Sequence, residues 1–218
     1  NWKDTITFFE DNLVAVGGNH YAPTAEELIV KLVLPQIKKV NKHILLEKNE
    51  DIRNLLLYEI LHQAKTLGRK RLNIAFAEDK TLTSGITEFP SLVEFYNKEF
   101  GKKIEMLKIY LIDPRELYLK NDEMYYKNHQ IDIIYRDFEL VDLFKMEKGK
   151  HIGAIKTAFK KNQIISSIAG ELDHKSCWEV LRDKRFAPLF SALINDGIMK
   201  HIPWTKIIRD IKTDNPID

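Results

Sequence analysis

Apolar side chains recur with a helical period in two segments near the start of the chain. Residues 50–67 have the most regular spacing and are followed by Gly68, so they predict a helix that glycine ends. Residues 24–41 have a similar spacing after a Thr24-x-x-Glu27 pattern, which is typical of an N-terminal capping box. Pro35 lies inside this second segment and predicts a kink or a break.

Strand and helix patterns alternate in the middle of the sequence. Residues 72–79 and 104–113 have the apolar runs of buried strands, and residues 89–101 between them have the spacing of an amphipathic helix. A strand, a helix and a second strand predict a right-handed crossover within a parallel sheet.

The later part of the chain continues this alternation. Residues 117–128 hold two short aromatic-rich runs around Asn121-Asp122, which predicts a hairpin. Further strands are expected at 131–138 and 163–168, and helices at 139–146, 150–162 and 173–194, the last with a break at Pro188. The pattern as a whole predicts an α/β fold with a mostly parallel sheet of three or four strands, flanked by helices.

Composition and charge exclude several classes of protein. The 218 residues are 44% hydrophobic and 30% charged, which indicates a folded globular chain and not a disordered one. The apolar runs are too short to span a membrane, and the NWKDTIT start lacks a signal-peptide pattern. A formal charge of +2 does not indicate nucleic acid or a membrane as a partner. A single cysteine, Cys177, excludes an intrachain disulfide and fits a cytoplasmic protein. The oligomeric state stays open.

The first candidate for chemistry is the polar triplet that follows Phe8 and Phe9. In a strand, alternate side chains share a face, so Glu10 and Asn12 would point the same way. A carboxylate beside an amide oxygen suits a hard cation such as Mg²⁺. The alternative is a strand end that turns into a polar loop.

A second candidate is Arg136, close to the carboxyl end of the strand predicted at 131–138. A buried parallel strand should be apolar on both faces. Ligands of open α/β sheets bind beyond the carboxyl ends of the strands, and arginine binds carboxylates and phosphates. The alternative is an ion pair of Arg136 with Asp137 or Glu139.

A third candidate is Asp173-His174-Lys175, where we expect a helix to begin with Asp173 as its N-cap. Lys175 would lie in the first turn, where a cation is unfavourable unless a phosphate joins it. The alternative is a solvated lysine. The sequence contains no HExxH, GxSxG, GxxxxGK[ST] or GxGxxG, which argues against zinc enzymes, serine hydrolases, Walker-type enzymes and Rossmann enzymes.

These segments, in this order, resemble the circularly permuted ATP-grasp family in its type 2 branch, relatives of glutathionylspermidine synthase. The resemblance is carried by Glu10-Asp11-Asn12 with Gly17-Gly18, by Ile131 to Arg136 with Asp137 in place of a second arginine, by Asp173-His174-Lys175, and by Pro203-Trp204-Thr205. It covers nearly the whole chain. It implies that 1–68 is part of the ATP-grasp region, 69–147 a pre-ATP-grasp-like α/β domain, and 148–218 the start of the remaining ATP-grasp region.

The resemblance implies an ATP- and Mg²⁺-dependent carboxylate–amine ligase. Such an enzyme converts a carboxylate to an acyl phosphate, from which an amine displaces phosphate to form an amide. Glu10 and Asn12 would be magnesium ligands, Asp173 and Lys175 would bind ATP, and Arg136 would be catalytic. The partners would be small-molecule or peptide carboxylates and amines.

The sequence also departs from the family. No acidic residue precedes Phe8 at a position that would complete the metal site, and the rest of the ATP-grasp half is expected beyond Thr205. We therefore expect a fragment that is inactive as a ligase by itself. The alternative function is a non-catalytic α/β binding or assembly module.

Overall fold

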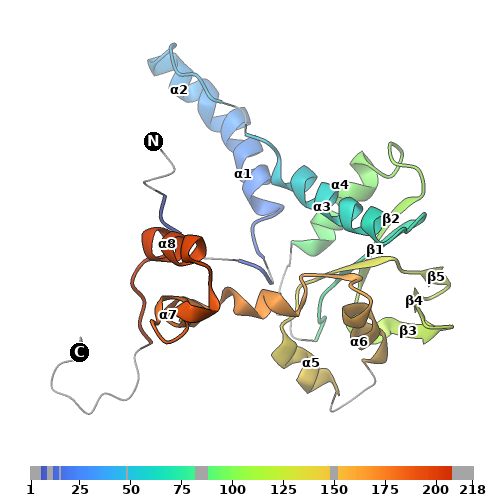
Figure 1. The fold of residues 1–218 in the computed structure, drawn as a ribbon. Helices are drawn as coiled ribbons and strands as arrows, with labels where there is room; N and C mark the ends of the chain where they lie inside the picture. Colours follow the sequence, from blue (N-terminus) through green and yellow to red (C-terminus); the bar gives the residue numbers. More distant parts are fainter. Residues whose placement is uncertain are drawn as a thin grey trace. The chain divides into compact units, whose positions relative to one another are not determined.

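The computed structural model describes residues 6–8, 12–14, 16–47, 49–81, 88–147 and 152–207 (Figure 1). The chain divides into two compact units, and each is described separately. Unit 1 combines Asn1–Leu13 with Ala169–Asp218, and unit 2 comprises Val14–Ile168. The family regions expected at 1–68, 69–147 and 148–218 remain a prediction.

A four-stranded parallel sheet forms the centre of unit 2, in the order β2-β1-β6-β7. Its strands are β1 (Leu72–Ala77), β2 (Leu107–Ile112), β6 (Ile133–Arg136) and β7 (Ile164–Ile165). Helix α4 (Phe89–Glu99) connects β1 to β2, as the crossover pattern predicts. The α/β class and the mostly parallel sheet are confirmed.

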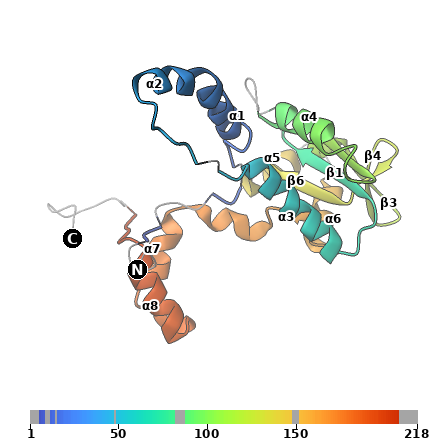
Figure 2. The same cartoon turned by 90° about the horizontal axis from the view of Figure 1, so that it is seen from above.

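Both faces of this sheet are buried under helices, because its neighbouring side chains alternate between two apolar clusters. Ile74 and Phe76 pack on one face with α3 (Ile52–Thr66) and α4, while Ala75 and Ala77 pack on the other. That second face is covered by α5 (Leu140–Glu147) and α6 (Gly153–Lys160), as Figures 1 and 2 show. A parallel sheet covered on both faces explains why its strands are almost continuously apolar.

A second, antiparallel sheet contains the predicted hairpin. Its strands are β3 (Leu117–Lys120), β4 (Glu123–Tyr126) and β5 (His129–Gln130), in the order β3-β4-β5. Asn121 and Asp122 join β3 to β4 with φ angles of 51° and 59°. Two left-handed residues in a two-residue loop match the twist of an antiparallel hairpin, and Asn and Asp tolerate that conformation best after glycine.

The first long helix begins earlier than the sequence predicts. It consists of α1 (Tyr21–Leu28), a π-helical turn (Ile29–Val33) and α2 (Leu34–Val40), whose first turn contains Pro35. The predicted capping box is wrong, because Thr24 lies inside α1 and its hydroxyl donates to the carbonyl of His20 at 2.7 Å. Glu27 forms an ion pair with Arg53 at 2.6 Å instead.

A distant carboxylate caps this helix. Glu88 accepts hydrogen bonds from the backbone amides of Asn19, His20 and Tyr21, at 3.2, 2.9 and 3.3 Å. These amides belong to the first turn, where N–H groups lack helical partners and the helix dipole favours negative charge. A single side chain from outside the helix therefore replaces the local cap.

We expect Glu88→Ala to release the start of α1. Loss of a helix cap costs about 1 kcal/mol, so hydrogen exchange of the amides of residues 19–22 should accelerate by roughly five- to tenfold. Glu94→Ala, on the exposed side of α4, is the matched control and should leave these amides unchanged. Equal exchange in the two variants would show that Glu88 does not hold this helix.

The described part of unit 1 includes the short helices α7 (Ser176–Arg182) and α8 (Ala192–His201), with a 3-10 turn at Ala187–Leu189 between them. The helix expected over 173–194 is therefore interrupted more widely than Pro188 alone predicts. Residues 6–8 lie along the end of α8, where the amide of Phe8 donates to the carbonyl of His201 at 2.9 Å.

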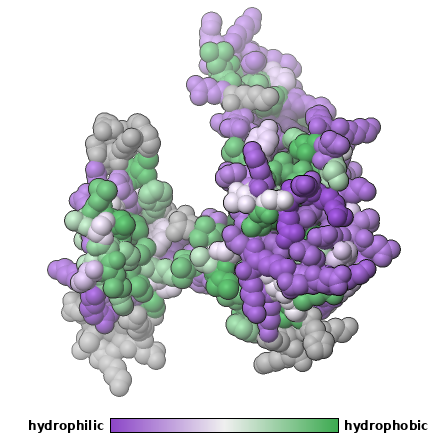
Figure 3. Space-filling view, turned by 45° about the vertical axis from the view of Figure 1, so that its right-hand side comes forward, coloured by the Kyte–Doolittle hydropathy of each residue, from purple (hydrophilic) through white to green (hydrophobic). Residues whose placement is uncertain are grey.

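Several large apolar side chains of unit 1 are exposed. Figure 3 shows hydrophobic side chains over the visible face of the α7–α8 region, while the visible face around the sheet is mainly hydrophilic. Leu189, Leu193 and Trp204 are 76%, 82% and 65% exposed. Among the described helices, none has both the length and the hydropathy that a bilayer span requires.

Candidate functional site

The carboxyl ends of β1 and β6 lie next to each other at a change of direction in the sheet. From β1 the chain moves to β2 on one side, and later returns to place β6 on the other side. Ala77 is the register partner of Arg136, and the amide of Asp137 donates to the carbonyl of Ala77 at 2.9 Å. Ligands of open α/β sheets bind at such switch points. We call this region the carboxyl edge, with Glu78 following β1 and Asp137 following β6.

The carboxyl edge holds several acidic groups within a partly buried environment. Burial, together with the nearby charges of Glu78 and Glu88, raises the pKa of Asp137 to about 6. Glu78 is only 5% exposed. Burial also raises the pKa of Tyr135 to about 12, and its hydroxyl accepts a hydrogen bond from Asn19 Nδ2 at 3.3 Å. A group with a pKa near 6 can exchange a proton close to neutral pH.

We expect Asp137→Asn to stabilise unit 2 at pH 8 and to have little effect at pH 4. The raised pKa means that the folded state loses stability as the pH rises from about 4 through 6, because Asp137 must then ionise beside two other carboxylates. The amide removes that cost, which is on the order of 1–3 kcal/mol. Urea unfolding at both pH values measures the difference.

Glu105→Gln is the matched control for this variant, since Glu105 is exposed and precedes the amino end of β2, away from the carboxyl ends of the strands. It should change the urea midpoint equally little at pH 4 and pH 8. If Asp137→Asn also changes the urea midpoint equally little at both pH values, the acidic groups of the carboxyl edge do not repel the Asp137 carboxylate.

A second group of charged side chains links the loops that follow β1 and β2. The Arg115 guanidinium contacts both Asp79 and Asp113, with Nε donating to Asp113 Oδ1 at 2.7 Å. Burial alone would raise the pKa of each aspartate, but the hydrogen bonds that each accepts outweigh burial and lower it. Asp79 accepts from Thr81 and Arg115. Asp113 accepts from Arg115 and Lys80. These aspartates are therefore ionised partners of a structural ion pair.

Arg136, the predicted catalytic residue, is 1% exposed in the described structure. Its Nε donates to the carbonyl of Ser166 at 2.7 Å, its Nη1 to that of Phe138 at 2.6 Å and its Nη2 to that of Ser167 at 2.9 Å. These bonds fasten the end of β6 to the segment after β7. They give Arg136 a structural role, and its catalytic role stays a prediction.

The other predicted site residues belong to unit 1. The structure places Lys175 at the N-cap of α7, and Asp173 in the preceding 3-10 turn, so the expectation that Asp173 caps this helix is wrong. The Asp173 carboxylate accepts a hydrogen bond from the amide of Leu13 at 3.2 Å. This bond joins two candidate segments that are 160 residues apart in the sequence.

The predicted magnesium ligands are described only in part. Asn12 is exposed and adjoins Leu13, while Glu10 lies outside the described residues. Within the described part of the chain, no group of three or more His, Cys, Asp and Glu residues is arranged to hold a metal ion. The amide oxygen of Asn12 and the carboxylate of Asp173 are nevertheless the hard oxygen donors that suit Mg²⁺.

The sequence analysis did not predict the acidic residues of the carboxyl edge or the ion pairs of Arg115 with Asp79 and Asp113. One signal for them was available, because Glu78 and Asp79 end the strand predicted at 72–79, and Asp113 ends the strand predicted at 104–113. Glu88 carried no such signal, since its partners lie 67 to 69 residues away.

The two sheets and the flanking helices can be compared with solved structures. A four-stranded parallel sheet flanked by helices, with a small antiparallel sheet beside it, matches the architecture of a glutathione synthetase-like protein. The solved structure is that of a glutathione synthetase-like effector (GSS30) from Globodera pallida in its apoform. The TM-score is 0.62 and the sequence identity 11%, over 90% of this chain.

This chain spans 44% of the effector's length. At 11% identity, the likeness shows a shared fold. No protein-family model matches the sequence, and no curated protein matches it either.

Proposed function

We propose that this chain is part of an ATP- and Mg²⁺-dependent carboxylate–amine ligase of the ATP-grasp type. The observation that carries the proposal is the structural likeness to a glutathione synthetase-like effector across 90% of the chain. The hydrogen bond between Leu13 and Asp173 supports it, because it joins two segments that the ATP-grasp resemblance places in one nucleotide site.

Unit 1 holds the proposed nucleotide and metal residues. Glu10 and Asn12 would supply oxygen ligands to Mg²⁺, and Asp173 would hold the Asn12 segment beside the start of α7 through its bond to Leu13. Lys175 is an exposed residue, and its ammonium group would contact a phosphate. When bound, Mg·ATP supplies the phosphoryl group that activates the carboxylate substrate.

Unit 2 holds the proposed substrate region at the carboxyl edge. Glu78 and Asp137 would attract the ammonium form of an amine substrate, since both are carboxyl groups at a switch point of the sheet. The amine must lose a proton before it can act as a nucleophile, and Asp137, with a pKa of about 6, is a suitable acceptor. Arg136 would have to exchange one of its carbonyl contacts before it could meet a substrate.

A non-catalytic binding module is the second candidate function. The observation that favours it is the exposed apolar surface of the α1–α2 segment, where Leu32 is 59% and Val40 92% exposed. A surface of this kind is typical of a protein contact. This function predicts that the protein does not bind Mg·ATP.

A phosphate-release assay with Mg·ATP and mixed amino acids or peptides tests the ligase proposal. We expect no turnover by the 218-residue chain alone and measurable turnover by the intact protein. Lys175→Ala in the intact protein should lower turnover at least tenfold, while Lys120→Ala, on the hairpin, should not change it. Turnover by the isolated chain would contradict the predicted division of the site, and an inactive intact protein would contradict the ligase function.

A further inference from the structure

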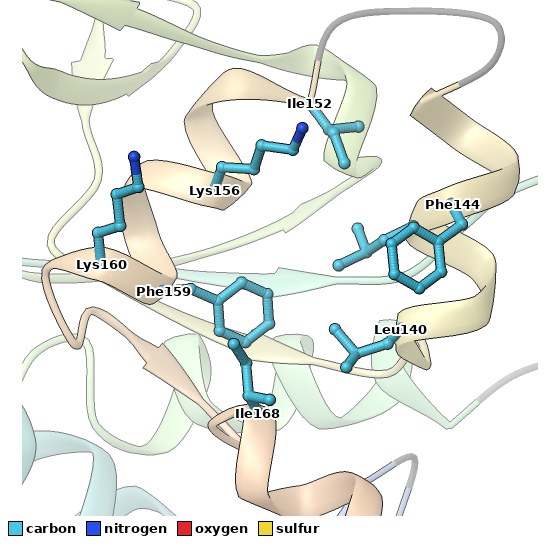
Figure 4. A pocket seen from close by; sticks show the side chains of 8 residues that line it. Leu140, Phe144, Ile152, Lys156, Phe159, Lys160 and Ile168 are labelled. Carbon is cyan, nitrogen blue, oxygen red and sulfur yellow. The ribbon is translucent and has the colours of Figure 1, made fainter.

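An apolar cavity lies between α5 and α6 on the face of unit 2 that the function above does not use. Its volume is about 330 Å³, within the range of small-molecule sites. Its lining consists of Leu140, Leu143, Phe144, Ile152, Lys156, Phe159, Lys160 and Ile168. Figure 4 shows Leu140 and Phe144 on the α5 side of the hollow, with Phe159 and Ile168 opposite them.

Some residues that line this cavity are buried in the hydrophobic core, and others are exposed to solvent. Leu143 and Ile152 are 5% and 4% exposed and belong to the buried cluster under the sheet. Phe144 and Ile168 are 62% and 56% exposed, although both are large and apolar. A ligand seated between them would remove this apolar surface from water, which is favourable at about 25 cal/mol per Å².

The two charged side chains of the described lining are both basic. Lys156 and Lys160, one helical turn apart on α6, are the charged residues of the lining. The guanidinium of Arg136 lies 5.5 Å from the ring of Phe159, which forms one wall. Among the described residues no acidic side chain lines the cavity. The complementary ligand therefore combines an apolar body with a negative group.

We propose that this cavity binds a linear aliphatic carboxylate, with the chain between Phe144 and Ile168 and the carboxylate beside Lys156 and Lys160. The lysines hold the head group at the surface of α6, where their long stems also cover apolar atoms. The proposal does not depend on the ligase function, since none of these lining residues belongs to the nucleotide or substrate regions proposed above.

The test is a titration of the 218-residue chain with decanoate, kept below its micelle concentration and followed by calorimetry. We expect one saturable site per chain, and binding of decyltrimethylammonium at least tenfold weaker. Non-saturable binding, or equal affinity for the cationic amphiphile, would overturn the proposal.

Variants locate the site. Phe144→Ala should weaken decanoate binding about tenfold, whereas Val141→Ala, an exposed position of α5 outside the lining, should not change it. The pair Lys156→Glu and Lys160→Glu should abolish the preference for the anion, whereas Lys108→Glu on β2 should preserve it. Unchanged affinity in Phe144→Ala and in the milder Ile168→Ala would overturn the assignment. Self-association that Phe144→Ala abolishes, without decanoate binding, would instead assign this face to a second copy of the chain.

Discussion

Replacement of Arg136 by methionine is expected to lower the free energy of unfolding by about 3–5 kcal/mol, which is a large part of the stability of a small domain. Methionine fills much of the same volume but cannot donate a hydrogen bond. The carbonyls of Phe138, Ser166 and Ser167 would each lose a charged donor in a region where Arg136 is 1% exposed. Urea unfolding at pH 7 measures the change.

Two further variants separate burial from charge. Arg71→Met removes an exposed arginine just before β1, so its effect should stay within about 0.5 kcal/mol. Arg136→Lys keeps the charge but cannot reach three carbonyls with one ammonium group, so it should fall between wild type and Arg136→Met. A wild-type midpoint for Arg136→Met would contradict the structural role assigned to this side chain.

Replacement of Arg115 by alanine is expected to cost about 3 kcal/mol at pH 7. It would leave the carboxylates of Asp79 and Asp113, which are 5% and 7% exposed, without their shared cation. The cost should shrink in acid. Because the pKa values of both aspartates are lowered, their contribution to stability is present above about pH 4 and is lost as the pH falls towards the folded-state values. Urea unfolding at pH 7 and pH 3 measures both effects.

Lys103→Ala serves as the control for the Arg115 variant. Lys103 pairs with Glu99 at 3.6 Å on the surface, and exposed pairs of this kind contribute little. If the two substitutions had equal and small effects, the Asp79–Arg115–Asp113 group would be no more than a surface ion pair.

The sheet could be predicted because its signals are local. The apolar run of β1, the amphipathic spacing of α4 and the apolar run of β2 lie next to one another, and a helical connection of this length favours a parallel pairing. The same holds for the hairpin at Asn121-Asp122, where the turn residues themselves favour the left-handed conformation. Periodicity fails where the deciding partner is remote. The cap of α1 comes from Glu88, far along the chain.

In the candidate site too, features that depend on remote partners could not be predicted from the sequence. The family resemblance predicted that the Asn12 and Lys175 segments act together, and the amide of Leu13 donates to the Asp173 carboxylate. The N-cap expected at Asp173 fails because this residue ends a 3-10 turn and α7 begins only after Lys175. The position of Glu78 at a strand end could be read from the sequence, but its closeness to Asp137 could not, since it depends on the pairing of β1 with β6. The burial of Arg136 could not be predicted either, because its hydrogen-bond acceptors are backbone carbonyls, which every residue type carries.

Glu10, Asn12 and Lys175 are proposed to form part of a Mg·ATP site. Calorimetric titration of the intact protein with Mg·ATP tests this claim most directly, with Glu10→Ala and Lys175→Ala beside wild type and Lys120→Ala as a control. We predict that wild type and Lys120→Ala bind Mg·ATP alike, and that each site variant binds it at least tenfold more weakly. Failure of wild type to bind, or unchanged affinity in both site variants, would contradict the claim.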